Sequence, residues 1–165
     1  MSFSIEKMHP EDWPLVSEIY LTGIRTGIAT FQSDVPTWEE WNKSHSENCR
    51  FVARSGNAIL GWIALTPISG RCVYAGVAEV SIYISEESRN QGVGTELLAE
   101  LIWRSEEAGY WTLQAAIIKD NIASRELFRK CGFREIGFRE KLGKMADGKW
   151  YDVVMVEKRS TSVGI

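Results

Sequence analysis

The residues from 78 to 102 constrain the fold most, because their hydrophobic period changes within a short stretch of chain. The first part, A-E-V-S-I-Y-I, alternates two kinds of side chain, which is typical of a β-strand with different faces. The segment R-N-Q-G-V-G interrupts this alternation. After it, apolar residues recur at helical spacing, at Val93, Leu97, Leu98, Leu101 and Ile102. The sequence therefore predicts a strand that leads through a glycine-containing turn directly into an amphipathic helix.

The other patterns place this unit within a mixed α/β chain. We expect strands at 3–8, 50–54, 59–66, 76–84, 112–118, 133–140 and 150–157, and helices that begin near Pro10, Thr37, Val93 and Asn121. In the first helix Leu15 falls on the apolar face, and T-W-E-E at Thr37 is a capping box. The stretch 112–118 is nearly all apolar, as in a strand buried on both faces. We predict a single domain, residues 1–165, with one mixed sheet flanked by helices.

Charge and composition exclude several classes of function. The chain has 165 residues, 44% of them hydrophobic, and a formal net charge of −3, which argues against a nucleic-acid-binding surface. No apolar run approaches the roughly 18 residues of a membrane span, and the first residues lack the apolar core of a signal peptide. Two histidines and three widely spaced cysteines give no metal-binding pattern. We expect a cytoplasmic protein with reduced cysteines and no metal.

The turn at Gly92 and Gly94 has the features of an anion site. The first N–H groups of a helix have no intrahelical partner and carry partial positive charge, and glycine lets the backbone approach a phosphate closely. A dinucleotide-binding fingerprint would need glycine at position 97, which is Leu97, and a phosphate-binding lysine is missing because Thr95-Glu96 follows the second glycine. Taken alone, the turn is equally compatible with a glycine-rich connection that binds nothing.

Further motifs resemble a known family. R/Q-x-x-G-x-G fits 89–94, and N-x-x-S-x-x-L-F-x-K-x-G-F fits 121–133 after the helix and the apolar strand. Together they resemble the Gcn5-related N-acetyltransferase (GNAT) superfamily over nearly the whole chain. Within it, A-E-V-S-I-Y-I, G-R-x-x-Y at 70–74 and D-G-K-W-Y-D at 147–152 are similar to the phosphinothricin/methionine-sulfoximine acetyltransferase group.

The resemblance implies a GNAT fold, in which two parallel strands splay apart and acetyl-CoA binds between them. The backbone of Ile82, Tyr83 and Ile84 would pair with the pantetheine arm. The loop residues Asn90, Gln91, Gly92, Val93, Gly94 and Thr95 would hold the pyrophosphate. Asn121 would hydrogen-bond the pantetheine side. Lys130 stands where it either meets a CoA phosphate or is a solvated cation at the end of a helix.

For catalysis, Glu79 is the candidate general base. An alkyl ammonium must lose a proton before its nitrogen attacks an acyl group, and a carboxylate can take that proton directly or through water. The alternative for Glu79 is an exposed carboxylate or a structural ion pair. Many superfamily members have a tyrosine as general acid where this chain has Phe128. Ser124, Tyr83 or water are the remaining donors, or the thiolate leaves unaided.

On the substrate side, Arg71 is a candidate clamp for a carboxylate, or else a loop cation in solvent. Resemblance to the subgroup places Phe31 and Tyr74 in the pocket wall, and Val80 and Ser81 beside Glu79. Trp150 and Tyr151 either close the pocket or pack elsewhere. The resemblance implies acetylation of a small amino acid or analogue by direct attack in a ternary complex, and a homodimer. Acetylation of another amine and a non-catalytic acyl-CoA-binding module remain open alternatives.

Overall fold

A computed structural model describes residues 2–165, and it contains one seven-stranded sheet in the order β1-β2-β3-β4-β5-β7-β6. The strands are β1 (Ser4–Lys7), β2 (Arg50–Ser55), β3 (Ala58–Pro67), β4 (Val77–Ile84), β5 (Thr112–Ile118), β6 (Arg134–Lys144) and β7 (Trp150–Arg159). The helices are α1 (Trp13–Arg25), α2 (Trp38–Ser44), α3 (Val93–Glu107) and α4 (Ile122–Lys130). The predicted order of helices and strands is confirmed, with short 3₁₀ turns added at Pro10–Asp12, Cys72–Tyr74 and Glu86–Ser88.

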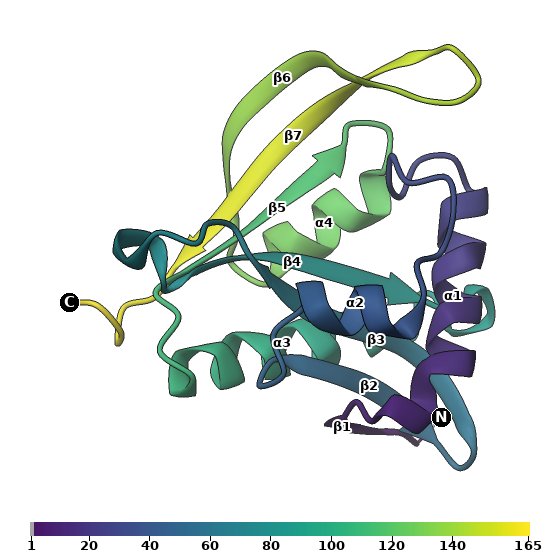
Figure 1. The fold of residues 1–165 in the computed structure, drawn as a ribbon, viewed down its shortest axis with the longest axis horizontal. Helices are drawn as coiled ribbons and strands as arrows, with labels where there is room; N and C mark the ends of the chain where they lie inside the picture. The colour runs from purple at the N-terminus through teal and green to yellow at the C-terminus, as the bar shows by residue number, and fades with distance from the viewer. Residues whose placement is uncertain (1) are drawn as a thin grey trace.

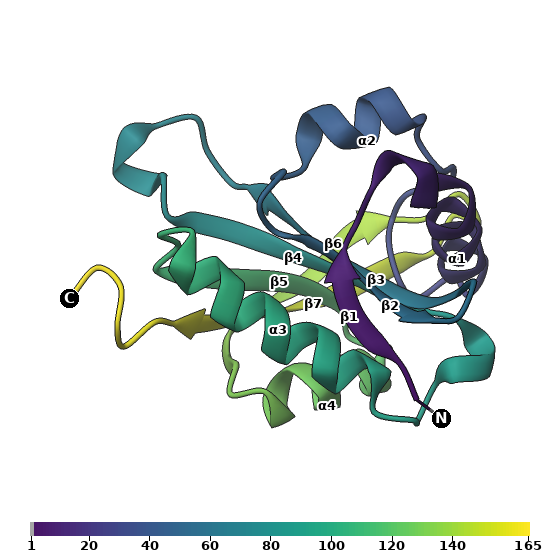
Figure 2. The same ribbon diagram turned by 90° about the horizontal axis from the view of Figure 1, so that it is seen from below.

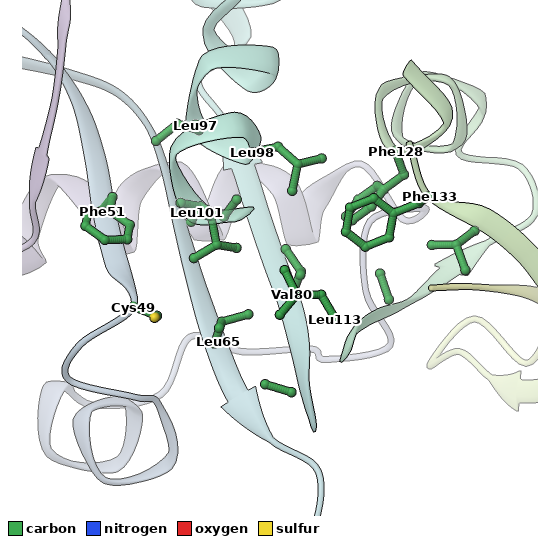
Figure 3. Close-up of a cluster of buried hydrophobic side chains, with 14 of the residues drawn as sticks. Cys49, Phe51, Leu65, Val80, Leu97, Leu98, Leu101, Leu113, Phe128 and Phe133 are labelled. Atoms are coloured by element: carbon green, nitrogen blue, oxygen red, sulfur yellow. The ribbon is translucent and has the colours of Figure 1, made fainter. Parts of the chain in front are cut away.

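Helices cover both faces of the sheet. Figure 2 shows α1 and α2 on one side and α3 and α4 on the other. On the α3 side, Leu97, Leu98 and Leu101 are fully buried against Leu65 and Leu113 of the sheet (Figure 3). Aromatic side chains fill the other core, where Trp41 and Trp62 are both buried. Within residues 2–165, no helix is both long and apolar enough to cross a membrane.

The sheet divides into two parts between β4 and β5. These two parallel strands pair only through Val77–Glu79 and Thr112–Gln114, and beyond that point they separate, as Figure 1 shows. All the other neighbouring strands in the sheet are antiparallel. We call the place where β4 and β5 separate the fork. It confirms the splayed parallel strands of the predicted GNAT fold.

Two burial predictions were wrong. Leu15 is 41% exposed, because the buried stripe of α1 runs through Val16, Ile19 and Tyr20 instead. The strand β5 is not buried on both faces, because Ala116 is exposed. The helix α1 packs over β3 and β4 and leaves that face of β5 open beside the fork.

Candidate active site

Glu79 lies at the fork. It pairs with Thr66 of β3 on one side and with Gln114 of β5 on the other, and the pair with Gln114 is the last that the parallel strands make. Alternation along β4 puts Glu79 on the same face as Tyr83, whose ring stacks on Tyr20 of α1 at 4.8 Å between centroids. The Glu79 side chain therefore points to the α1 side of the sheet, where the exposed Ala116 also lies.

Burial raises the pKa of the Glu79 carboxyl group, and a hydrogen bond from the backbone of Ala116 partly opposes this shift. The carboxyl group is half-buried, so solvent or a small amine can still reach it. A raised pKa makes the carboxylate a better proton acceptor at neutral pH. This environment is compatible with the predicted general base, and no ion pair engages Glu79 within residues 2–165.

The far half of β4 has a free backbone edge. In the described chain, residues 80–84 pair with β3 alone, from Val80 with Leu65 to Ile84 with Gly61. Because Ser85 N donates to Leu60 O of β3, the backbone groups of the alternate residues Ile82 and Ile84 face the fork, whereas those of Tyr83 face β3. An extended ligand with amide groups can add to such an edge as another strand would. Such an edge suits the pantetheine arm that is predicted to bind here.

A turn with free backbone N–H groups follows β4, at the predicted anion site. Gly92 is the N-cap of α3 with φ +84°, and Asn90 is also left-handed with φ +60°. The first hydrogen bond of α3 runs from Glu96 N to Gly92 O at 3.1 Å. The N–H groups of Val93, Gly94 and Thr95 therefore have no acceptor within the helix and are available to a phosphate.

Two residues of this turn have further structural roles. The Gln91 side chain donates from Nε2 to the carbonyl oxygen of Glu87 at 2.7 Å, so its backbone is the part that remains for a ligand. A Cβ atom at Gly94 would lie 3.0 Å from Cδ2 of Leu127 in α4. Gly94 thus also permits the close approach of α3 to α4. Of the two glycines, Gly92 is the one with a left-handed backbone.

The two predicted cofactor residues of α4 lie at opposite ends of that helix. Asn121 is the N-cap, and its Oδ1 accepts a hydrogen bond from Ser124 N at 3.2 Å, which leaves the amide N–H groups for a ligand. Asn121 follows the end of β5, in the region where β5 no longer pairs with β4. Lys130 ends the helix and is exposed, so its role at a CoA phosphate remains a prediction.

The candidate proton donors differ in their surroundings. Phe128 is 2% exposed and packs edge-on against Phe133 in the hydrophobic core. Tyr83 packs against Tyr20 and Trp62, which also contact each other. Burial raises the pKa of the Tyr83 hydroxyl, with the neighbouring Tyr20 adding to the shift. A raised pKa makes Tyr83 a weaker acid than an ordinary tyrosine.

The predicted substrate residues fall into separate groups. Arg71 and Tyr74 are exposed in the loop before β4, where the guanidinium carbon lies 5.5 Å from the ring centroid. Phe31 follows α1 and lies beside β6, at Gly143. Ser81 is half-buried on the Glu79 face, whereas the Val80 side chain is in the core, so only its backbone can meet a substrate.

Other residues of this region also have defined places. The hairpin residue Trp150 is 55% exposed, and Tyr151 is half-buried. The sequence patterns did not indicate that Gln114, Ala116 and Gly143 lie in this region. The polar residue at Gln114 could have indicated a second, less buried face of β5.

Among residues 2–165, no group of three or more His, Cys, Asp or Glu side chains is placed to hold a metal ion.

Comparison with known proteins agrees with this geometry. The profile of the acetyltransferase (GNAT) family matches residues 11–133. YwnH of Bacillus subtilis, named provisionally as a phosphinothricin acetyltransferase, is 37% identical over 147 residues, which cover 86% of this chain and 90% of YwnH. The L-methionine sulfoximine/L-methionine sulfone acetyltransferase of Pseudomonas aeruginosa is 26% identical, over 95% of this chain and 94% of its own length.

A solved structure is similar over nearly the whole chain. It is the phosphinothricin acetyltransferase of Sinorhizobium meliloti in complex with acetyl-CoA, with a TM-score of 0.87 and 25% identity, covering 99% of this chain and 91% of that one. The splayed strands, the free edge of β4 and the turn at Gly92 suit the same cosubstrate. This chain therefore belongs to the acetyltransferase (GNAT) family.

Proposed function

We propose that this protein transfers an acetyl group from acetyl-CoA to the amino group of a small amino acid or an analogue, of the phosphinothricin or methionine sulfoximine/sulfone type. The observation that carries the proposal is the position of Glu79, half-buried at the fork beside the free edge of β4. The names of the relatives support the substrate class, since two of them act on amino-acid analogues.

The reaction proceeds by direct attack in a ternary complex. Acetyl-CoA lies along Ile82, Tyr83 and Ile84, and the amine approaches from the Glu79 face. Glu79 accepts a proton from the substrate ammonium, directly or through water, and the freed nitrogen attacks the thioester carbonyl. The C–N bond forms, the C–S bond breaks, and the CoA thiolate leaves. The nitrogen loses its second proton to water, and Glu79 returns the first one to solvent. General-base help of this kind typically contributes about 10²–10⁴ in rate.

The proton for the departing thiolate comes from Ser124 or water. Phe128 cannot donate one, and burial raises the pKa of the Tyr83 hydroxyl. A thiol pKa near 8.5 makes the thiolate a fair leaving group without a strong acid. The buried Cys49 has a pKa raised to about 11 by burial, which does not suit a nucleophile for an acetyl-enzyme.

The same proposal includes a homodimer as the oligomeric state and the cytoplasm as the location of the protein. Resemblance to the phosphinothricin acetyltransferase group is the basis for the dimer. The exposed apolar residues Ile136 and Phe138 on the outermost strand β6 support it. Sedimentation at micromolar concentration distinguishes a dimer from a monomer.

The test is release of CoA thiol from acetyl-CoA in the presence of individual amines. The panel contains phosphinothricin, methionine sulfoximine, methionine sulfone, proteinogenic amino acids, a polyamine, an aminoglycoside and a peptide N-terminus. We expect the highest kcat/KM among the amino-acid analogues. Highest activity on another panel member would assign a different amine, and acetyl-CoA binding without turnover would indicate a non-catalytic acyl-CoA-binding module.

A further inference from the structure

The far half of β4 packs on two glycine residues, one on each face of the sheet. A Cβ atom at Gly23 of α1 would lie 2.5 Å from Cδ1 of Tyr83 and 2.7 Å from Cε1. A Cβ atom at Gly61 of β3 would lie 2.8 Å from Cδ1 of Ile84 and 2.9 Å from the backbone oxygen of Tyr83. Tyr83 and Ile84 therefore occupy the space that a side chain at 23 or 61 would need.

The backbone conformation of these two residues does not require glycine. Neither Gly23 nor Gly61 has a left-handed φ, so their conformations are open to any residue. Glycine weakens the interior of a helix or strand, and these two buried residues lie within α1 and β3. The close approach of β4 is thus the physical reason for a glycine at both positions.

The Tyr83 ring has little room to move independently of its strand. It packs against Tyr20 of α1 and Trp62 of β3, at 4.8 and 5.0 Å between ring centroids. Tyr20 and Trp62 are themselves buried. Because such a core is close-packed, an atom added at Gly23 is expected to displace the β4 backbone together with the ring.

The backbone that would be displaced is the free edge of β4. Ile82 and Ile84 present their backbone groups to the fork, and Tyr83 lies between them. Figure 1 shows this end of β4 beside α1. Glu79 lies four residues earlier, where β4 pairs with a strand on each side. The two glycine contacts therefore act on the candidate acetyl-CoA edge and leave the position of the carboxylate unchanged.

We propose that Gly23 and Gly61 are positioning residues for acetyl-CoA. By leaving space for Tyr83 and Ile84 on the two faces of the sheet, they determine where the free edge of β4 lies. The inference rests on the proposed function only for its acetyl-CoA site. Alignment of the pantetheine amides with the edge depends on this position, and a misplacement of about 1 Å can cost about 100-fold in rate.

The test measures acetyl-CoA affinity by calorimetry, without an amine, in Gly23→Ala, Gly61→Ala and Gly137→Ala. Gly137 of β6 is the matched control, because its φ is not left-handed and a Cβ atom there would meet nothing within 4 Å. We expect Kd to rise about tenfold or more for the first two variants and to stay within about twofold for the control.

Kinetics separate positioning from a general loss of structure. In Gly23→Ala, KM for acetyl-CoA should rise in parallel with Kd. KM for the amine and the pH dependence of kcat, which depends on Glu79, should stay those of wild type. Alanine is also the better helix former, so a loss of affinity in Gly23→Ala does not come from a weaker α1.

A second arm removes the ring instead of the space. Tyr83→Val should weaken acetyl-CoA binding, because the edge loses its contact with α1. This variant adds no volume, so it carries the test even where an added methyl group prevents folding. Gly23→Ala should cause no further loss when combined with Tyr83→Val, since Cγ of Tyr83 is 3.8 Å from the added Cβ, an ordinary contact distance.

Three results would overturn this inference and leave the proposed function intact. The first is equal acetyl-CoA affinity in Gly23→Ala, Gly61→Ala and Gly137→Ala. The second is wild-type affinity in Tyr83→Val, and the third is an equal effect of Gly23→Ala with and without the Tyr83 ring. A wild type that binds acetyl-CoA but acetylates no amine would overturn the proposed function alone, because affinity is measured without an amine.

Discussion

Glu79 stands directly opposite Gln114 in the last pair that β4 and β5 form before they separate. Up to this pair, β4 pairs with a strand on each side, and beyond it β4 pairs with β3 alone. The Glu79 carboxylate therefore lies at the boundary between the sheet and the candidate ligand site. This position explains both its partial burial and the direction of its pKa shift. The fork thus brings together a proton acceptor and an edge for the acyl donor.

Replacing Glu79 by glutamine should lower kcat by about 10²–10⁴ at neutral pH, because the amide keeps the shape but accepts no proton. Calorimetry should show little change in acetyl-CoA affinity. The loss should shrink at high pH, where the amine arrives already neutral. Glu140→Gln, at an exposed position of β6, is the control and should keep wild-type turnover. Near wild-type kcat for Glu79→Gln at pH 7 would remove Glu79 from this role.

The same carboxyl group should affect stability with a defined sign. Because its pKa is raised in the folded state, the native protein binds this proton more tightly than the unfolded chain does. The stabilisation is complete below the unfolded pKa and is lost as pH rises through the folded value. Glu79→Gln should therefore have a higher Tm than wild type at pH 7. Thermal unfolding at a series of pH values should show this difference disappearing toward pH 4.

Gly92 and Gly109 provide a matched pair for the anion site. Both have a left-handed φ, +84° and +89°, with nothing within 4 Å of a Cβ atom, and they lie at opposite ends of α3. Alanine at either position should cost about 1–2 kcal/mol of stability. Only Gly92→Ala should also weaken acetyl-CoA binding, by about tenfold, because its turn orients the free N–H groups. Similar acetyl-CoA affinities in the two variants, measured by calorimetry, would contradict the site.

Gly94→Val should also weaken acetyl-CoA binding, as the sequence alone predicts, but it has a second effect. The added side chain must push against Leu127, since a Cβ atom there already lies 3.0 Å from it. Its loss of affinity should therefore be accompanied by a loss of helix packing and a lower Tm. The Gly92 variant separates these effects, and the comparison shows how much of the Gly94 result comes from packing.

Local patterns in the sequence were enough to predict most of the fold. The Thr37–Glu40 capping box is formed by both of its hydrogen bonds, at 3.0 and 3.3 Å. The strand and turn around Glu79 and Gly92 follow from alternation and glycine placement within one short segment. Such features depend on neighbours in the chain, so composition and spacing are sufficient to find them.

The parts of the fold and site that the sequence did not predict depend on contacts between distant segments of the chain. Nothing near Phe31 or Gly143 in the sequence indicates that they meet, because the contact joins the loop after α1 to strand β6 at the other end of the sheet order. Likewise Ala115 and Ala116 are the same residue type, yet the first is buried and the second exposed. The placement of α1 over β3 and β4, and not the residue type, makes the difference.

Arg71 should determine whether the substrate needs a carboxylate. Its guanidinium is exposed beside Tyr74, and within residues 2–165 no acidic side chain forms an ion pair with it. It is therefore available to a ligand, and a charge-assisted bidentate contact is worth about 1.5–3 kcal/mol, or roughly 10- to 150-fold in kcat/KM. The enzyme should prefer an amino acid over the matching amine without the carboxylate by that factor. Arg71→Ala should remove most of the preference and hardly affect the amine, and Arg71→Lys should restore only part, because an ammonium lacks the planar fork. The measurement is kcat/KM for this pair of substrates on all three proteins. Equal losses on both substrates would show that Arg71 supports its loop and does not recognise a carboxylate.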